Sequence, residues 1–147
     1  MAPGHLELTA DEMRALGRSV VELLVDHFSN IHDEPVGRKA SRQELESLFG
    51  SDLPEQPGDP AQILSAVKDG LLPNSLHIDH PRFFAFVPSP NNFVSVMADA
   101  LIAGFNTFAG TYFAGSGPAH IELTVIDWLR QICGLPDSAG GLLVSGG

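Results

Sequence analysis

Residues 80–92 read HPRFFAFVPSPNN, and an apolar run, FVSVMADALIAGFN, follows at residues 93–106. The three prolines fix their own φ angles and push the residues before them into extended conformations, so the first stretch is predicted to be extended and rigid. Its phenylalanines alternate between the two sides of such a segment, and most aromatics in this pattern belong to a core or wall a pocket. The apolar run predicts a buried helix over residues 93–105, with Asn91 or Asn92 as its N-cap.

The first predicted helix covers about residues 10–31. Thr9 followed by Glu12 makes a capping box, and apolar residues recur behind it at helical spacing. The apolar stripe is wide for an element that opens the chain and is followed by a polar loop. We therefore expect this helix to pack on something supplied from elsewhere, and a partner subunit is one candidate.

Two shorter helices are predicted between this helix and the proline-rich stretch. Ser41 and Glu44 form a second capping box, and Gly50 is the stop signal of that helix. Asp59 with Pro60 at the first helical position predicts the start of the third helix. The third helix is expected to end before Gly70.

The C-terminal part of the chain carries one more helix signal and one strand signal. Pro118 opens the pattern PAHIELTVIDWLRQICG, which predicts a helix that ends at Gly134. Residues 140–147, GGLLVSGG, predict a short buried strand and a glycine turn, which in α/β proteins commonly leads into a phosphate-binding helix N-terminus. Because the sequence nearby offers no partner strand, we expect this domain to be cut short at the end of the chain.

The composition narrows the class of protein. The chain has 147 residues and a formal net charge of −10, which disfavours nucleic acid and anionic membrane surfaces as partners. Its single cysteine, Cys133, excludes an internal disulfide, and the N-terminus lacks the pattern of a secretory signal. Residues 93–113 contain Asp99 and several polar residues, so they are not typical of a bilayer span. A cytoplasmic protein is the expectation.

Two groups of residues have side chains that could form chemical sites. His77, Asp79 and His80, in the pattern HIDH, have a spacing at which a metal ion can be shared, but a structural or hydrogen-bonding role is favoured, and no metal site is predicted. His120 and Glu122 fall in the predicted first turn of the PAHIEL helix, where helix capping is favoured over a projection of His120 toward the glycine-rich loop.

The two lysines, Lys39 and Lys68, are predicted to be solvated, because their neighbours are polar or charged. Neither a serine-nucleophile elbow nor a Walker loop occurs in the sequence. The residues present therefore form no complete catalytic set.

Three segments carry a family resemblance. In order and spacing, HPRFFAFVPSPNNFVSVMADALIAGFN, SGPAHIELTVIDWLRQICGLP and GGLLVSGG resemble the N-terminal third of the group II pyridoxal-phosphate-dependent amino-acid decarboxylases, the family of aromatic-amino-acid and glutamate decarboxylases. The first helix and the tripeptide EPV are also similar to the opening of that family. The resemblance covers nearly the whole chain.

The resemblance implies an α/β protein with the type I aminotransferase-like fold. Residues 1–80 would be a helical N-terminal dimerisation arm with its linker, and residues 81–147 would be the incomplete start of the large domain that binds pyridoxal 5'-phosphate. The arm would wrap around the other protomer of a homodimer, which would bury the stripe of the first helix.

The resemblance also implies substrate-binding residues. The family's pocket series of an aromatic, an apolar, a proline and a small hydroxyl residue falls on Phe86, Val87, Pro88 and Ser89. Ser89 would donate a hydrogen bond to the substrate carboxylate, and Phe86 stands where aromatic-specific members often have tyrosine. The loop from Phe108 to Tyr112 would reach the active site of the neighbouring subunit, although an apparent small insertion precedes Gly117.

Gly146 and Gly147 would approach the cofactor phosphate. The implied activity is decarboxylation of a small L-amino acid, aromatic or otherwise bulky, to an amine and carbon dioxide. The Schiff-base lysine and the other catalytic residues would lie downstream, so the chain alone is expected to be inactive until the remainder of the polypeptide or a companion chain completes the site. The alternatives are a pyridoxal-phosphate-dependent aldehyde synthase or lyase of the same fold, or a non-catalytic helical dimerisation fragment.

Overall fold

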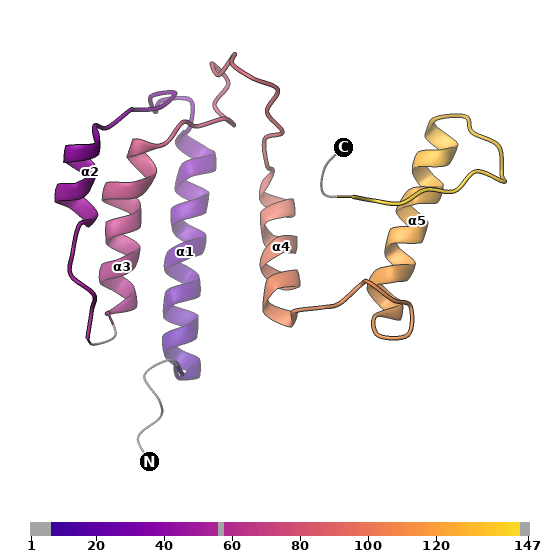
Figure 1. Cartoon of the computed structure of the whole chain (residues 1–147), viewed down its shortest axis with the longest axis horizontal. Helices are drawn as coiled ribbons and strands as arrows, with labels where there is room; N and C mark the ends of the chain where they lie inside the picture. The colour runs from indigo at the N-terminus through magenta and orange to yellow at the C-terminus, as the bar shows by residue number, and fades with distance from the viewer. Residues whose placement is uncertain (1–6, 56–57, 145–147) are drawn as a thin grey trace. The chain divides into compact units, whose positions relative to one another are not determined.

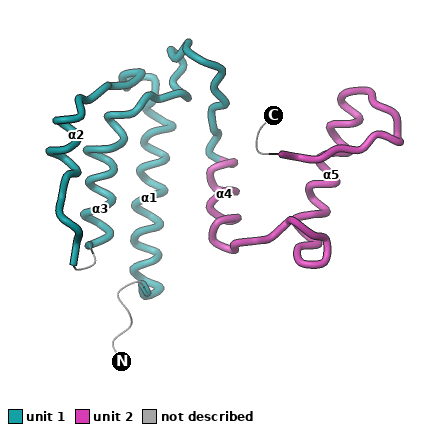
Figure 2. Tube along the Cα trace, viewed as in Figure 1, with its two compact units in different colours: residues 1–93 teal, residues 94–147 magenta. Residues whose placement is uncertain are grey.

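The chain, seen in a computed structural model, is described over residues 7–55 and 58–144. It divides into two compact units, residues 1–93 and residues 94–147 (Figure 2). The elements of the first unit are α1 (Ala10–Asn30), α2 (Arg42–Phe49), α3 (Pro60–Ala66), the π-helix η1 (Val67–Leu71) and the 3-10 helix η2 (Leu72–Asn74). Helix α4 (Phe93–Phe105) begins at the boundary, and α5 (Ser116–Ile132) belongs to the second unit (Figure 1).

Both predicted capping boxes are confirmed. At α1 the Thr9 N–H donates to Glu12 Oε2 at 2.7 Å and the Glu12 N–H donates to Thr9 Oγ1 at 3.3 Å. Ser41 and Glu44 repeat the arrangement at α2. The side-chain and backbone hydrogen bonds from Thr9 lower the pKa of Glu12 below 4.5, and the backbone and side-chain bonds from Ser41 do the same for the pKa of Glu44.

The third helix begins as predicted, and α3 ends at Ala66, before Gly70. Asp59 accepts the Ala61 N–H at 3.2 Å, and Pro60 takes the first helical position. The chain then continues through η1 and η2, and the Asn74 side chain donates to the Gly70 carbonyl at 2.7 Å. Gly70 is buried against the Phe49 ring of α2, which a Cβ at residue 70 would meet at 3.0 Å. This glycine permits a close contact between helices rather than ending one.

The first unit is closed by a contact between two connections. Gly37 and Leu76 form an isolated antiparallel bridge, and the His77 N–H donates to the Val36 carbonyl at 2.8 Å. Helix α3 lies beside α1 (Figure 1). Within the described residues, the buried positions are Ile31, Gly70 and His80.

In the second unit the helix ends follow their sequence signals. Asn106, with φ 47°, ends α4, and its N–H donates to the Ile102 carbonyl. Gly134, with φ 64°, follows α5; its N–H donates to the Gln131 carbonyl and the Leu135 N–H donates to the Arg130 carbonyl, which is a Schellman motif.

Three expectations for the second unit are corrected. Helix α5 starts at Ser116, two residues before Pro118, so Glu122 falls in the second turn and does not cap the helix. No residue of α4 is buried within this chain, although the sequence predicts a buried helix. Residues 140–144 form no strand in the described part of the chain, and Leu142 and Val144 are exposed. Strand hydrogen bonds need a neighbouring strand, and the described residues offer none.

Candidate functional site

The predicted substrate residues at 86–89 lie on an exposed stretch of the first unit. Phe86 is 84% exposed and Val87 is 99% exposed, and Pro88 and Ser89 are exposed as well. Phe86 has φ 61°, a conformation that is rare and strained for an aromatic residue. Its ring lies 6.2 Å, centroid to centroid, from the half-buried Phe83 ring. The stretch therefore presents apolar side chains and one hydroxyl to whatever covers it.

His80 anchors the start of this stretch. The residue is 3% exposed, its Nδ1 accepts the Arg82 N–H at 2.9 Å, and its Nε2 lies 3.1 Å from the Glu34 carbonyl oxygen. Because a carbonyl oxygen only accepts, Nε2 carries the proton and the ring is a neutral bridge between two backbone groups. Both nitrogens are thus occupied, which gives His80 a structural role.

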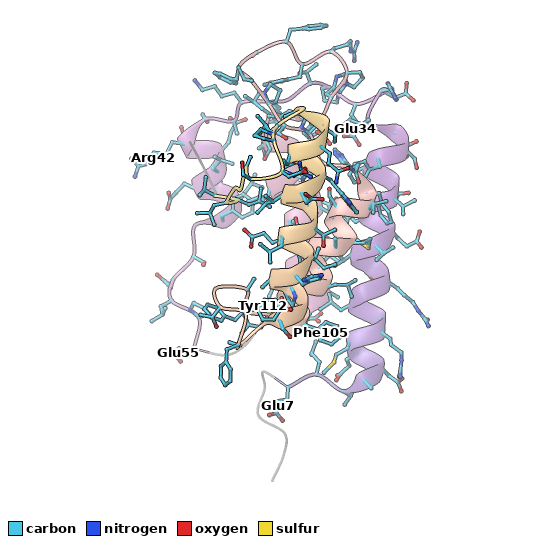
Figure 3. All side chains as sticks on the ribbon, turned by 90° about the vertical axis from the view of Figure 1, so that its right-hand side faces the viewer. Glu7, Glu34, Arg42, Glu55, Phe105 and Tyr112 are labelled. Carbon is cyan, nitrogen blue, oxygen red and sulfur yellow. The ribbon has the colours of Figure 1, made fainter. Side chains whose placement is uncertain are left out.

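The other predicted substrate residues, Phe108 and Tyr112, lie in the loop between α4 and α5, where Figure 3 labels Tyr112. Both side chains are mostly exposed. The loop folds back on itself: the Ala114 N–H donates to Thr111 Oγ1 and the Gly115 N–H donates to the Thr111 carbonyl. A Cβ at Gly115 would collide with the Phe108 carbonyl oxygen, so this position requires glycine. The structure places these two residues in a different unit from Phe86 to Ser89.

The segment that leads toward the predicted phosphate turn rests on α5. Glu122 Oε1 accepts the Leu143 N–H at 3.4 Å, and a Cβ at Gly141 would meet the Ile126 side chain at 3.2 Å. Gly146 and Gly147, the predicted cofactor-binding residues, lie outside the described residues. His120 is exposed on α5, and Lys39 and Lys68 are exposed in the first unit, as predicted.

The structure also brings together four side chains that the sequence does not connect. His27 Nε2 lies 2.8 Å from Asp79 Oδ2, and Glu34 Oε2 lies 3.7 Å from His27 Nδ1 and 3.4 Å from His77 Nδ1. The HIDH pattern thus separates in space: His77 and Asp79 face α1, whereas His80 turns to the backbone. His27 and Glu34 were missed because nothing in their spacing relates them to residues about fifty positions later.

A groove of about 570 Å³ lies along α1 and α3. Leu16, Leu23 and Leu64 contribute apolar surface, and Glu22 and Asp26 are among its acidic residues. Phe86 to Ser89 do not line it. The groove is therefore separate from the predicted substrate residues.

Comparison with protein families identifies the chain. The model of the pyridoxal-dependent decarboxylase conserved domain matches residues 42–147. The chain belongs to this family. It is 43% identical over 143 residues to an aromatic-L-amino-acid decarboxylase of Bacillus atrophaeus, with 97% of this chain and 30% of the relative covered. It is 31% identical over 140 residues to a phenylacetaldehyde synthase of Petunia hybrida, with 95% of this chain and 27% of the relative covered.

The same likeness holds in three dimensions. The crystal structure of Oryza sativa TDC with PLP and tryptamine matches with a TM-score of 0.82 at 24% identity, over 94% of this chain and 28% of that one. The predicted fold class, that of the type I pyridoxal-phosphate enzymes, is confirmed, and the described residues are the helical part of it. The chain spans about 30% of the length of the curated decarboxylase it matches. None of the helices in the described part combines the length and the hydropathy that a membrane span requires.

Proposed function

We propose that this chain is the N-terminal part of a pyridoxal-phosphate-dependent L-amino-acid decarboxylase that acts on an aromatic or other bulky substrate and releases carbon dioxide and an amine. The observation that carries the proposal is the family match over residues 42–147, supported by the 43% identity to an aromatic-L-amino-acid decarboxylase. When bound, the cofactor supplies an electron sink for the electrons of the broken bond. The protein supplies binding and orientation.

The exposed stretch at residues 86–89 suits one wall of the substrate pocket. Phe86, Val87 and Pro88 offer rigid apolar surface to a bulky side chain, and proline limits the conformational entropy lost on binding. The Ser89 hydroxyl is exposed and would donate a hydrogen bond to the substrate carboxylate. Held at both ends, the substrate would present one bond at Cα to the cofactor in a fixed orientation.

Groups that hold the cofactor would come mainly from residues beyond this chain. Lys39 and Lys68 are exposed on the first unit and do not fit a buried, covalently bound cofactor. Gly146 and Gly147 would lie next to the cofactor phosphate. The chain alone is therefore proposed to be inactive, and completed by the rest of the same polypeptide or by a companion chain.

The assembly proposed is a cytoplasmic homodimer. Residues 1–80 would form the dimerisation arm and linker, and residues 81–147 the start of the large domain. The support is that no residue of α1 is buried within this chain, although Met13, Val20 and Val25 are apolar. Covering such a surface is a common result of symmetric association. Phe108 and Tyr112 would then reach the active site of the neighbouring subunit.

The test uses the whole polypeptide in which this chain occurs. Purified with pyridoxal 5'-phosphate, it is expected to show the absorbance band of the bound cofactor and to release carbon dioxide and an amine from phenylalanine, tyrosine or tryptophan. A chain that ends at Gly147 serves as the inactive control. Failure to bind the cofactor would refute the proposal.

One observation favours a second function. The 31% identity to a phenylacetaldehyde synthase supports an enzyme of the same fold that forms an aldehyde instead of an amine. Product analysis of the same reaction by mass spectrometry separates the two, because the aldehyde lacks the nitrogen that the amine keeps.

A further inference from the structure

Three side chains from separate segments of the first unit converge at the end of α1. His27 lies in the last turn of α1, Glu34 lies in the connection that follows, where Figure 3 labels it, and His77 follows the bridge at Leu76. One potential ligand atom from each of the three lies within 4.8 Å of the others. The His77 side chain is only 14% exposed, so this cluster is partly shielded from water.

The contacts of the two rings indicate which nitrogen would carry the proton in a neutral ring. His27 Nε2 lies 2.8 Å from the Asp79 carboxylate, and His77 Nε2 lies 3.5 Å from the Leu72 carbonyl oxygen. Both oxygens only accept, so in neutral rings the protons sit on Nε2 and the lone pairs on Nδ1. Both Nδ1 atoms nevertheless face Glu34 Oε2, which is itself an acceptor.

Such an arrangement is unfavourable unless a proton on Nδ1 or a metal ion lies between these atoms. His77 Nδ1 is buried and has no hydrogen-bond partner, and leaving a buried polar atom unpaired costs on the order of 1–3 kcal/mol. Two imidazole nitrogens and a carboxylate oxygen within 4.8 Å of one another match the donor set of a metal ion. Glu34 and Asp79 together carry the charge that balances a divalent cation.

We propose that His27, Glu34 and His77 bind one divalent transition-metal ion of the zinc class, with Asp79 orienting His27. Two imidazoles and a carboxylate suit Zn²⁺, and water takes the fourth position. Bond lengths of about 2.0–2.1 Å separate neighbouring ligand atoms of a tetrahedral ion by roughly 3.4 Å. The observed separations from Glu34 Oε2 are 3.4 and 3.7 Å. The contact between His27 and Asp79 is the usual carboxylate–histidine–metal arrangement.

The metal ion would hold three segments together next to residues 83–89, which include the proposed substrate residues. His77 precedes the His80 anchor by three residues, and His80 is bonded to the carbonyl of Glu34, which is itself a ligand. The role inferred for the metal is to hold these segments together, so its effect on function is to fix the start of residues 83–89. Its ligands are separate from the residues proposed to touch substrate.

The test measures metal binding directly. The whole polypeptide is prepared without a tag and with the background substitution Cys133→Ser, which removes the exposed thiol of this chain. It is treated with a chelator, dialysed, and titrated calorimetrically with ZnCl₂ at pH 7.5. We expect one site per chain, and visible absorption bands of a tetrahedral ion when Co²⁺ replaces Zn²⁺. Asp79→Asn is expected to lower the affinity by roughly tenfold to a hundredfold. Glu34→Gln and His77→Ala are expected to lower it further.

The matched control is His32→Ala, which removes an exposed histidine from the same connection and should leave the affinity unchanged. Far-ultraviolet circular dichroism of Glu34→Gln, which nearly preserves shape, checks that the variant is folded. The proposal is overturned by the absence of a saturable site in the folded protein, or by binding that Glu34→Gln leaves unchanged. Proton uptake by the two histidines without metal binding would also overturn it.

Discussion

Replacing His80 by alanine tests how residues 83–89, which include the proposed substrate residues, are anchored. The ring of His80 satisfies two backbone groups, the Arg82 N–H and the Glu34 carbonyl, and the residue is 3% exposed. Losing one such hydrogen bond costs about 1 kcal/mol when water replaces the partner, and more when it does not. Two bonds therefore give a loss of about 2 kcal/mol in the free energy of local opening. Since about 1.4 kcal/mol is a factor of ten, amide protection should fall about thirtyfold.

The assay is hydrogen exchange of the Phe83 and His80 amides, followed by NMR in the presence of EDTA. These amides donate to the His80 and His77 carbonyls at 2.8 and 3.0 Å, and both acceptors survive in the variant, so their exchange reports opening of the turn rather than loss of a partner. The variant His80→Asn should recover about half of the loss, because an asparagine side chain can accept the N–H two residues later. Protection of Phe83 within threefold of the unsubstituted protein would refute the reasoning.

Three further predictions concern other parts of the chain. Hydrogen bonds in the capping box lower the pKa of Glu12, so the stability that its carboxylate gives α1 is fully present above pH 4.5 and is lost as the pH falls through the lowered pKa. Circular dichroism should show this loss of helix in acid, and Glu12→Gln should remove the pH dependence. Gly115→Ala places a Cβ against the Phe108 carbonyl and should raise protease cleavage in that loop, whereas Gly117→Ala, with open space around it, should not. In the complete enzyme, Ser89→Ala should raise KM for the amino acid roughly tenfold to a hundredfold, by loss of a charge-assisted hydrogen bond, as steady-state kinetics would measure.

Local structure was predictable because its causes lie within a few residues. The boxes at Thr9 and Ser41, the cap at Asp59 and the glycine after α5 each satisfy backbone groups of their own turn. These signals predicted α1, α2, α3 and α5, and the apolar run at residues 93–105 predicted α4. The start of α5 was misplaced because Gly115, which has no side-chain cap, precedes it.

Features that join distant segments were not predictable from spacing. Gly70 looked like a stop signal, because a glycine after a short helix commonly is one, and only the Phe49 ring across the helix pair shows its packing role. His27 and Glu34 gave no signal of the partners that reach them from residues 77 and 79. The strand predicted within residues 140–147 is absent from the described residues 140–144, for the related reason that a strand depends on a neighbour.

Contacts within the chain stabilise one part of residues 80–89, whereas burial of apolar side chains by another surface would stabilise the other part. Within the described part, the buried residues Ile31, Gly70 and His80 lie where helices and connections of the first unit meet. Hydrogen bonds and close contacts of the chain itself therefore fix the start of residues 83–89. Farther along, Phe84 and Val87 are 91% and 99% exposed. Covering each would contribute about 1.5–3 kcal/mol, more than the roughly 1 kcal/mol of a helix cap. The order of residues 84–89 is therefore expected to depend on the surface that covers them. The order of the backbone at His80 is not expected to depend on that surface.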